Sequence, residues 1–406
     1  MAQIKFRRLD VRSSLLRAMV LVNAFIVAAG LSAALYMETM GHAVTGMNNQ
    51  VVWGLPHVFA VFLIVSASGA LNVASVSSVF HRLAYKPFAR LSGVLALSLL
   101  AGGLMILVLD LGRPDRLLVA VTNNNFRSIF AWNIYLYSGF FVIVTGYLFS
   151  MMDRRVSKMK DVNQAFGWTA FAWRLVLTTG TGSIFGFLAA RSAVFGGIMA
   201  PLFIASSLVY GLAFTVLVLM TMSYETRGRL CTAEMLGKFR GLLAVFALTT
   251  LFLTAISHVS RLYGSQTAGV ERFLLVSGGI YPVMFWIGQV VIGNLIPLAL
   301  LAFMGEGASG RRSLVLASLL FLVGGLAQMY VVIIGSQAYP LTIFPGFEVS
   351  SSFFDGAINP YTPTLPEALL GMAGISVAML IAALAFYLLP FLPQGEEEAE
   401  GAYVTP

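Results

Sequence analysis

Ten apolar segments, each long enough to cross a bilayer as a helix, constrain this chain more than any other feature of its sequence. A membrane-spanning helix needs about 20 mainly apolar residues. Such windows lie at residues 17–37, 56–79, 91–110, 130–151, 168–189, 198–222, 241–259, 279–304, 313–335 and 366–390. Only 10% of the 406 residues are charged and 58% are hydrophobic, a balance that a soluble protein of this length cannot accommodate. The sequence therefore predicts an all-α polytopic membrane protein of about ten transmembrane helices.

The fifth segment is the weakest of the ten, because Arg174 and a run of Thr and Gly interrupt it. The basic residues predict the orientation of the helices. Of the 25 Lys and Arg residues, 18 fall on the side of the N-terminus and six on the opposite side. Loops that stay in the cytoplasm are enriched in Lys and Arg. We therefore expect both termini to be cytoplasmic, and we call the opposite side outer.

A shift of 148 residues predicts how the helices are grouped. It lays the first four spans roughly on the next four, and Asp110 and Arg113 fall on His258 and Arg261. In both places an ionisable group is followed three residues later by Arg, although sequence identity across the shift is negligible. This spacing favours two four-helix bundles formed by a parallel repeat. The expected boundaries are residues 1–160 for the first bundle, 161–305 for the second and 306–392 for two additional helices.

Two segments outside the expected bundles have distinct compositions. The outer loop 336–366 is long and contains no Lys or Arg. An ordered loop of this length is expected to be a docking surface or a lid rather than a linker. The acidic tail 393–406 is expected to be solvated.

Ionisable residues gather at the outer ends of the predicted helices, and charges placed in or near a bilayer are usually functional. A quinol that gives up its electrons must also lose two protons, which carboxylates and imidazoles can accept near neutral pH. The alternative is that each residue simply faces water or lipid headgroups. The candidate quinone-binding residues are Glu38, His42, His57, Asp110, Arg113 and His258.

The motif Asp110-Leu-Gly-Arg-Pro-Asp-Arg116 allows two interpretations. Gly112 and Pro114 end the helix, and Asp110 can then pair with Arg113 one turn further on. In the simpler interpretation, Arg113 is a cation at the negative end of a helix dipole. In the functional interpretation, Arg113 keeps Asp110 ionised beside a ligand.

Arg174 lies about one turn inside the fifth span. Its side chain either reaches back to the cytoplasmic surface or faces the bundle. In the second case it would form part of a proton path from the inside, together with Tyr224 and Glu225.

The few Cys and His residues limit the redox groups that the protein can hold. Its single cysteine, Cys231, excludes an iron–sulfur cluster of its own and an internal disulfide. Of the four His residues, only His81 is on the inside, which excludes a pair of haems across the membrane. One outer haem between His57 and His258 is the alternative.

The DLGRP element at residues 110–114 resembles the NrfD/polysulfide-reductase family of membrane subunits. A second resemblance is the pattern of Arg174, Thr-Gly-Thr-Gly and Gly186, with Pro201 at the start of the next helix. Ten helices and the segment 345–370, with EVSSSFFDG and YTPTLPE, resemble one branch of that family. This branch contains the DsrP subunits of the DsrMKJOP complex of dissimilatory sulfur metabolism.

The resemblance implies two four-helix bundles and no haem or iron–sulfur cluster in this protein. It implies a multi-pass protein of the prokaryotic plasma membrane with a quinone site near the outer face, to which Asp110 and Arg113 would belong. The implied partner beside that face is a periplasmic ferredoxin-like iron–sulfur subunit similar to DsrO. Further implied partners are haem b and cytochrome c subunits and a cytoplasmic iron–sulfur subunit, similar to DsrM, DsrJ and DsrK.

The sequence thus predicts a quinone-reactive membrane subunit of a respiratory oxidoreductase. It would exchange electrons between menaquinone or ubiquinone and the iron–sulfur partner, with coupled proton release or uptake. Two other functions remain open at this point. Ten helices and a repeat also suit a secondary transporter or ion channel, although transporters usually carry charges or broken helices near the midplane. A non-catalytic membrane anchor would leave Glu38, His57 and Asp110 without a role.

Overall fold

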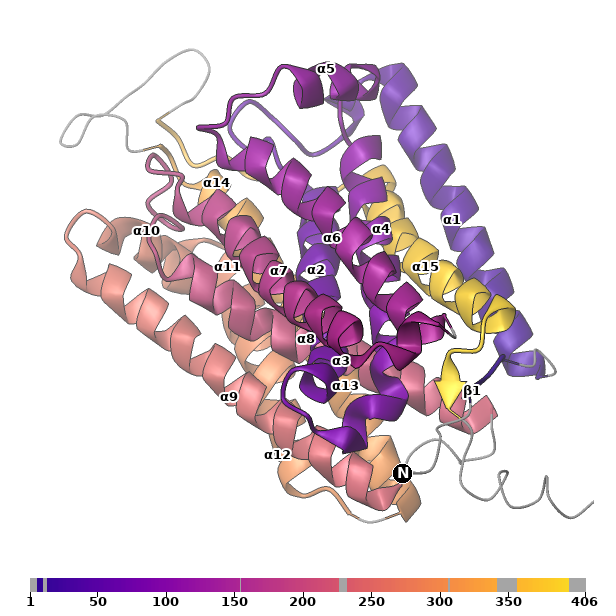
Figure 1. The fold of residues 1–406 in the computed structure, drawn as a ribbon. Helices are drawn as coiled ribbons and strands as arrows, with labels where there is room; N and C mark the ends of the chain where they lie inside the picture. The colour runs from indigo at the N-terminus through magenta and orange to yellow at the C-terminus, as the bar shows by residue number, and fades with distance from the viewer. Residues whose placement is uncertain are drawn as a thin grey trace, which may run out of the picture.

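The computed structural model describes residues 6–9, 13–153, 155–225, 232–305, 307–341 and 356–393. Nearly all of this part of the protein is helical, and the helices lie roughly along one common axis (Figure 1). The two strands, β1 (Phe6–Arg7) and β2 (Leu392–Pro393), pair antiparallel and join the beginning and the end of the described residues. The all-α fold is therefore confirmed.

Nine segments of the described residues are long and apolar enough to cross a membrane. They contain the long helices α1 (Ser14–Met40), α2 (Leu55–Ala70) with α3 (Asn72–Ser78), α4 (Ala89–Leu109), α6 (Ile129–Met152), α8 (Met199–Glu225), α9 (Ala233–Tyr263), α11 (Ile280–Val283) with α12 (Ile296–Ala302), α13 (Gly307–Tyr330) and α15 (Leu365–Leu388). The tenth predicted span forms α7 (Lys160–Gly186), which has 27 residues and lies along α6 and α8. It is less apolar because it begins with Lys160 and Asp161 and carries Arg174.

Shorter elements connect these helices. Three of them are π-helical: η5 (Phe273–Ser277), η6 (Met284–Leu295) and η7 (Val331–Gly335). The remaining short helices are η1 (His42–Val44), η2 (Leu83–Phe88), η3 (Pro114–Arg116), α5 (Leu117–Thr122), η4 (Val156–Lys158), α10 (Ala268–Arg272) and α14 (Ser336–Ala338). We call the end of the molecule that holds α5 and α10 the distal end (Figure 1); it corresponds to the predicted outer side.

Helices α2 and α8 form the centre of the molecule and are almost wholly buried. They pack against each other, and Gly69 of α2 meets Gly211 of α8 so closely that no side chain fits between the two backbones. Close contact at small residues is typical of helix pairs in membranes. By contrast, α1 and α9 expose most of their apolar side chains, as expected of helices that face lipid.

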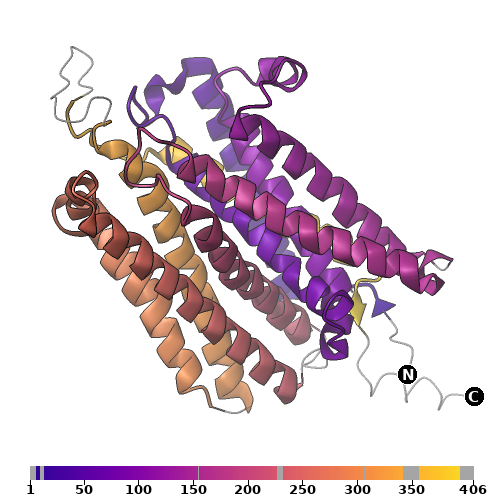
Figure 2. The same ribbon diagram turned by 60° about the vertical axis from the view of Figure 1, so that its left-hand side comes forward.

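The packing groups the helices differently from the predicted division. α1 lies along α15, which also packs on α4 and α2, whereas α13 packs on η6 and α8. The last two long helices therefore do not form a unit of their own, because each joins a different side of the molecule. In Figure 2, α9 to α13 (coral to orange) form one side, and α6 and α7 (magenta) form the other.

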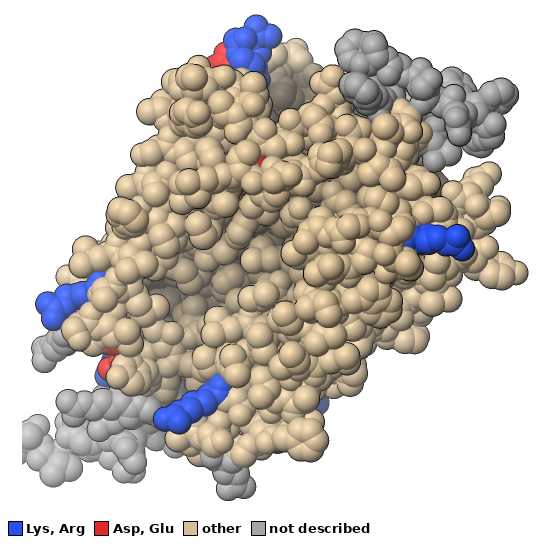
Figure 3. All heavy atoms as spheres, turned by 180° about the vertical axis from the view of Figure 1, so that it is seen from behind, with Lys and Arg blue, Asp and Glu red and all other residues tan. Residues whose placement is uncertain are grey.

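The surface agrees with a membrane-embedded protein. On the face shown in Figure 3, Lys and Arg lie toward the edges of the molecule, and the broad area between them is almost entirely free of charged side chains. The acidic tail from residue 394 onward and residues 342–355 of the long outer loop lie outside the described residues.

Candidate functional site

Asp110 and two histidines meet at the distal end. Asp110 follows the last residue of α4, and its side chain is fully buried. His57 lies in the first turn of α2, and its Nδ1 atom is 2.8 Å from Oδ2 of Asp110. His42, in η1, places its Nε2 atom 3.1 Å from the Asp110 carbonyl oxygen and 4.0 Å from Oδ1. Three of the predicted site residues are thus brought together.

The Asp110 carboxylate is close to His57 but is not satisfied by it. The two side chains lie at ion-pair distance, yet they are not aligned for a hydrogen bond. Within the described residues, neither carboxylate oxygen has a hydrogen-bond partner. Buried polar groups in proteins are nearly always hydrogen-bonded, so a buried carboxylate left in this state indicates a place for a ligand.

An aromatic wall encloses the His57 side of this site. The Trp53 ring stacks on the His57 imidazole, with 6.1 Å between ring centroids. Phe130 of α6 and Phe185 of α7 each lie 5.8 Å from Trp53. Phe130 is tilted against the Trp53 ring and Phe185 meets it edge-on, so His57 lies beside a cluster of aromatic rings.

A polar network that the sequence did not reveal holds Trp53 in place. Gln337 accepts hydrogen bonds from the backbone N–H groups of Val52 and Trp53 and donates one to the Trp53 carbonyl, all at 3.0 Å. Arg191 donates to the carbonyl oxygens of Gln337 and Gln50, both at 2.8 Å. These partners are 141–285 residues apart in sequence, so no local pattern could have predicted them.

The predicted pairing of Asp110 with Arg113 is wrong. Arg113 instead donates two hydrogen bonds of 3.0 Å to the carboxylate of Asp115, and both side chains are exposed. Arg113 lies between the end of α4 at Leu109 and the turn η3, which begins at Pro114. Its backbone is no longer helical, and its side chain lies outside the site. The hydrogen bond from Arg113 lowers the pKa of Asp115. Glu38 is exposed at the end of α1.

His258 belongs to a second cluster at the distal end. Its Nδ1 atom is 2.7 Å from Oε2 of Glu271, and Arg261 donates a hydrogen bond to the other carboxylate oxygen of Glu271. The two pairs that the 148-residue shift aligns therefore make different contacts. His258 and Arg261 of α9 both bind the carboxylate of Glu271 in α10, whereas Arg113 binds Asp115 and not Asp110. Glu271 was not among the predicted site residues, because its partners lie 10 and 13 residues away on another helix.

The haem alternative stays a prediction. His57 and His258 each contact a different carboxylate through Nδ1, Asp110 and Glu271. Among the described residues, no three His, Cys, Asp or Glu side chains are grouped so as to hold a metal ion.

The proposed proton-path residues are not in contact with one another. Arg174 is only 3% exposed, so its side chain faces the bundle rather than the cytoplasmic surface. It donates to Oδ1 of Asn72 at 2.8 Å. Glu225 accepts a hydrogen bond of 2.7 Å from the Ser13 hydroxyl, and Tyr224 is 70% exposed. A proton path through these residues stays a prediction.

Comparisons with known proteins match nearly the whole sequence. The family model described as polysulphide reductase, NrfD matches residues 43–340. The Hdr-like menaquinol oxidoreductase integral membrane subunit of Archaeoglobus fulgidus is 27% identical over 398 residues, covering 96% of this protein and 97% of the relative. The NrfD homolog of Haemophilus influenzae is 23% identical, covering 74% and 98%. The menaquinone reductase integral membrane subunit of Nitratidesulfovibrio vulgaris is 23% identical, covering 91% and 90%.

Proposed function

Because the chain belongs to the polysulphide reductase NrfD family, we propose that it is the quinone-reactive integral membrane subunit of a multi-subunit oxidoreductase. Two of its relatives are named for menaquinol or menaquinone. The proposed task is to exchange electrons between a membrane quinone and an iron–sulfur cluster of a partner subunit at the distal end.

The observation that carries this proposal is the buried, unsatisfied carboxylate of Asp110. It lies beside two imidazoles and near a cluster of aromatic rings. Neither of its oxygens makes an aligned hydrogen bond within the described residues. A quinol hydroxyl would supply a donor to this carboxylate.

The chemistry assigned to these residues is proton transfer. Oxidation of one quinol releases two electrons and two protons. Asp110 accepts the hydrogen bond from a quinol hydroxyl and then its proton, while the adjacent His57 takes up a proton or passes it on. The electrons leave to the partner's cluster, and quinone reduction reverses each step.

More specific assignments rest on the sequence resemblance. We propose a DsrP-like subunit of sulfur metabolism in the plasma membrane, with DsrO-, DsrM-, DsrJ- and DsrK-like partners and menaquinone or ubiquinone as substrate. Both termini would be cytoplasmic, and proton release or uptake would accompany turnover. A proton path through Arg174, Tyr224 and Glu225 would lead into the protein from the inner side.

The substitution Asp110→Asn tests the proposal directly. It keeps the size of the side chain but removes the base, so quinol oxidation by the purified complex should fall by about 10²-fold or more. The matched control is Asp115→Asn, which makes the same change at an exposed carboxylate five residues away and should keep nearly full activity. Both rates are measured with a soluble quinol on complexes shown to contain all subunits.

The outcomes separate the candidate functions. Equal rates in Asp110→Asn and Asp115→Asn complexes would contradict the quinone function and favour a membrane anchor. Solute or ion flux by the protein alone in liposomes, without quinol oxidation, would instead favour a transporter or channel.

A further inference from the structure

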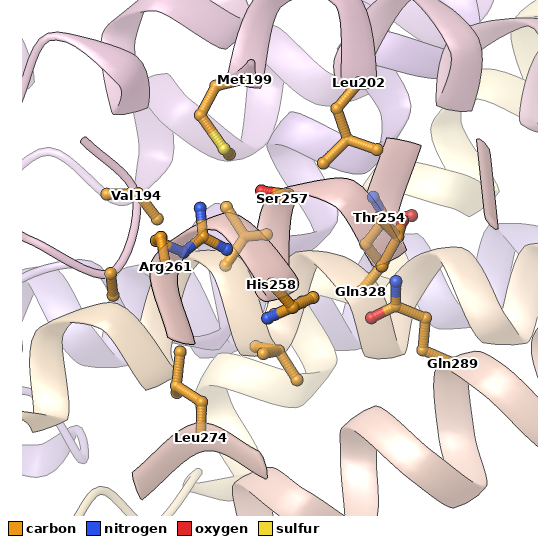
Figure 4. Close-up of a pocket in the computed structure, with 13 residues that line it drawn as sticks. Val194, Met199, Leu202, Thr254, Ser257, His258, Arg261, Leu274, Gln289 and Gln328 are labelled. Atoms are coloured by element: carbon orange, nitrogen blue, oxygen red, sulfur yellow. The ribbon is translucent and has the colours of Figure 1, made fainter. Parts of the chain in front are cut away.

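A second pocket lies at the distal end, away from Asp110. Its volume is about 20 Å³. Apolar side chains such as Val194, Met199 and Leu202 line part of it (Figure 4). The polar part of the lining consists of Thr254, Ser257, His258, Arg261, Gln289 and Gln328.

Three hydrogen-bond donors at this pocket have no partner within the described residues. They are the hydroxyls of Thr254 and Ser257, which are 3% and 2% exposed, and the Nη1 atom of Arg261. Helical Ser and Thr hydroxyls commonly bond to the carbonyl four residues earlier, and Thr249 and Thr250 of the same helix do so. Thr254 and Ser257 do not, so their natural partner is a molecule in the pocket.

The backbone around the pocket supports the same conclusion. Three π-helical segments contribute to its lining: η5 through Leu274, η6 through Gln289, and η7 through Val331 and Val332. π-Helical turns are rare and are frequently found at functional sites. Their convergence on one small pocket is difficult to explain by packing alone.

The charges at the pocket determine what it can hold. Glu271 neutralises Arg261 and binds His258, so a small anion finds no net positive charge. A cation would face the guanidinium of Arg261. Among the lining residues only His258 and Arg261 ionise, and Glu271 contacts both. A neutral molecule is therefore favoured, and the volume admits water but not a quinone ring.

We propose that this pocket is a hydrated proton-exchange site, in which ordered water bound by Ser257, Thr254 and Arg261 exchanges a proton with the His258–Glu271 pair. A proton that arrives on the water converts the neutral imidazole to the imidazolium, which Glu271 stabilises. Its return to water restores the neutral pair. The step needs no oxidant or reductant, and the site does not depend on quinone binding at Asp110.

Two measurements on the purified protein in lipid nanodiscs test this site. A cryo-EM map that resolves water should show density within hydrogen-bond distance of Ser257 Oγ and Arg261 Nη1. A dry pocket, or one filled by a lipid tail, would overturn the proposal. The second measurement is an infrared pH titration with isotope-labelled histidine, in which the bands of His258 are identified by their loss in His258→Gln.

The titration is compared between two serine variants of α9. Ser257→Ala removes a proposed water ligand, whereas Ser260→Ala makes the same change at an exposed position of the same helix. We expect the infrared bands of His258 to change reversibly with pH, and we expect this change to differ from the wild type in Ser257→Ala but not in Ser260→Ala. His258 bands that do not respond to pH, or that respond equally in both variants, would overturn the proposal. Neither measurement uses quinol turnover, so failure of the proposed function would not affect the result, and the water density in the cryo-EM map remains informative if His258→Gln does not fold.

Discussion

Asp110, Glu271 and Glu367 are the buried carboxylates of the described residues, and their partners assign them different roles. Glu367 accepts hydrogen bonds from the backbone N–H groups of Gly46 and Thr364 and from the hydroxyls of Tyr361 and Thr364, at 2.8–3.0 Å. A carboxylate with four donors is structural. Glu271 is held by His258 and Arg261, whereas Asp110 has no aligned donor and is the carboxylate that we propose to react with quinol.

Glu367 also helps to position the candidate site. The Tyr361 hydroxyl donates to Glu367 and accepts a hydrogen bond of 2.7 Å from the backbone N–H of Leu55, the first residue of α2. This fixes the start of the helix that carries His57. We expect Glu367→Gln to lower the free energy of unfolding by about 2 kcal/mol or more, because an amide cannot satisfy all four donors. Thermal unfolding in detergent checks this, with the exposed Glu38→Gln as the control; equal stability of both variants would show that the network is dispensable.

Glu271 predicts a pH dependence of stability. Burial raises the pKa of this carboxyl, but the hydrogen bond from His258 and the charge of Arg261 outweigh burial, and the pKa lies below the ordinary value of 4.5. A lowered pKa in the folded state stabilises the protein at pH above the ordinary value, and this stabilisation is lost as the pH falls through the folded-state pKa. Unfolding followed between pH 6 and pH 3 should therefore show a steeper loss of stability in the wild type and in Glu38→Gln than in Glu271→Gln. An identical slope in all three would contradict this assignment.

At the scale of the helices, the sequence predicted which residues form the long helices, but it did not predict which helices pack against each other. The apolar windows located nine of the long segments, and the interruption at Arg174 marked the one that falls short in hydropathy. The box Thr364-Leu-Pro-Glu367 at the start of α15 is a readable capping signal. In contrast, the packing partners of the helices depend on contacts between distant segments. No periodicity in the sequence encodes these contacts.

The α2–α8 crossing gives a test at this scale. A Cβ atom on Gly211 would overlap the backbone of Gly69 and Ala70. Gly211→Ala should therefore lower the free energy of unfolding by about 1–3 kcal/mol. Gly237→Ala is the matched control, because a Cβ atom there meets nothing within 4 Å and alanine favours the helix by up to about 1 kcal/mol. Thermal melts in detergent that rank the two variants in the opposite order would contradict the close crossing.

At the scale of the whole molecule, two polar sites lie at one end of an otherwise apolar body. The Asp110 site draws on α2, α4, η1 and the aromatic wall from α6 and α7, whereas the His258 pocket draws on α9, α10 and the three π-helical segments. From the sequence, His42, His57, Asp110 and His258 were predicted to form a single cluster at the outer ends of the helices, and Glu271 was not predicted. In the folded protein they form two sites, because Asp110 contacts His57 and Glu271 contacts His258.

The most direct test of the central claim is photolabelling of the purified complex with a photoreactive quinone analogue, followed by mass spectrometry of the labelled peptides. Our account predicts label in the peptides that contain His42, Trp53, His57 and Asp110, competed by unlabelled quinone and reduced in Asp110→Asn but not in Asp115→Asn. Label that is insensitive to competition, or that is confined to peptides away from these residues, would contradict a quinone site at Asp110.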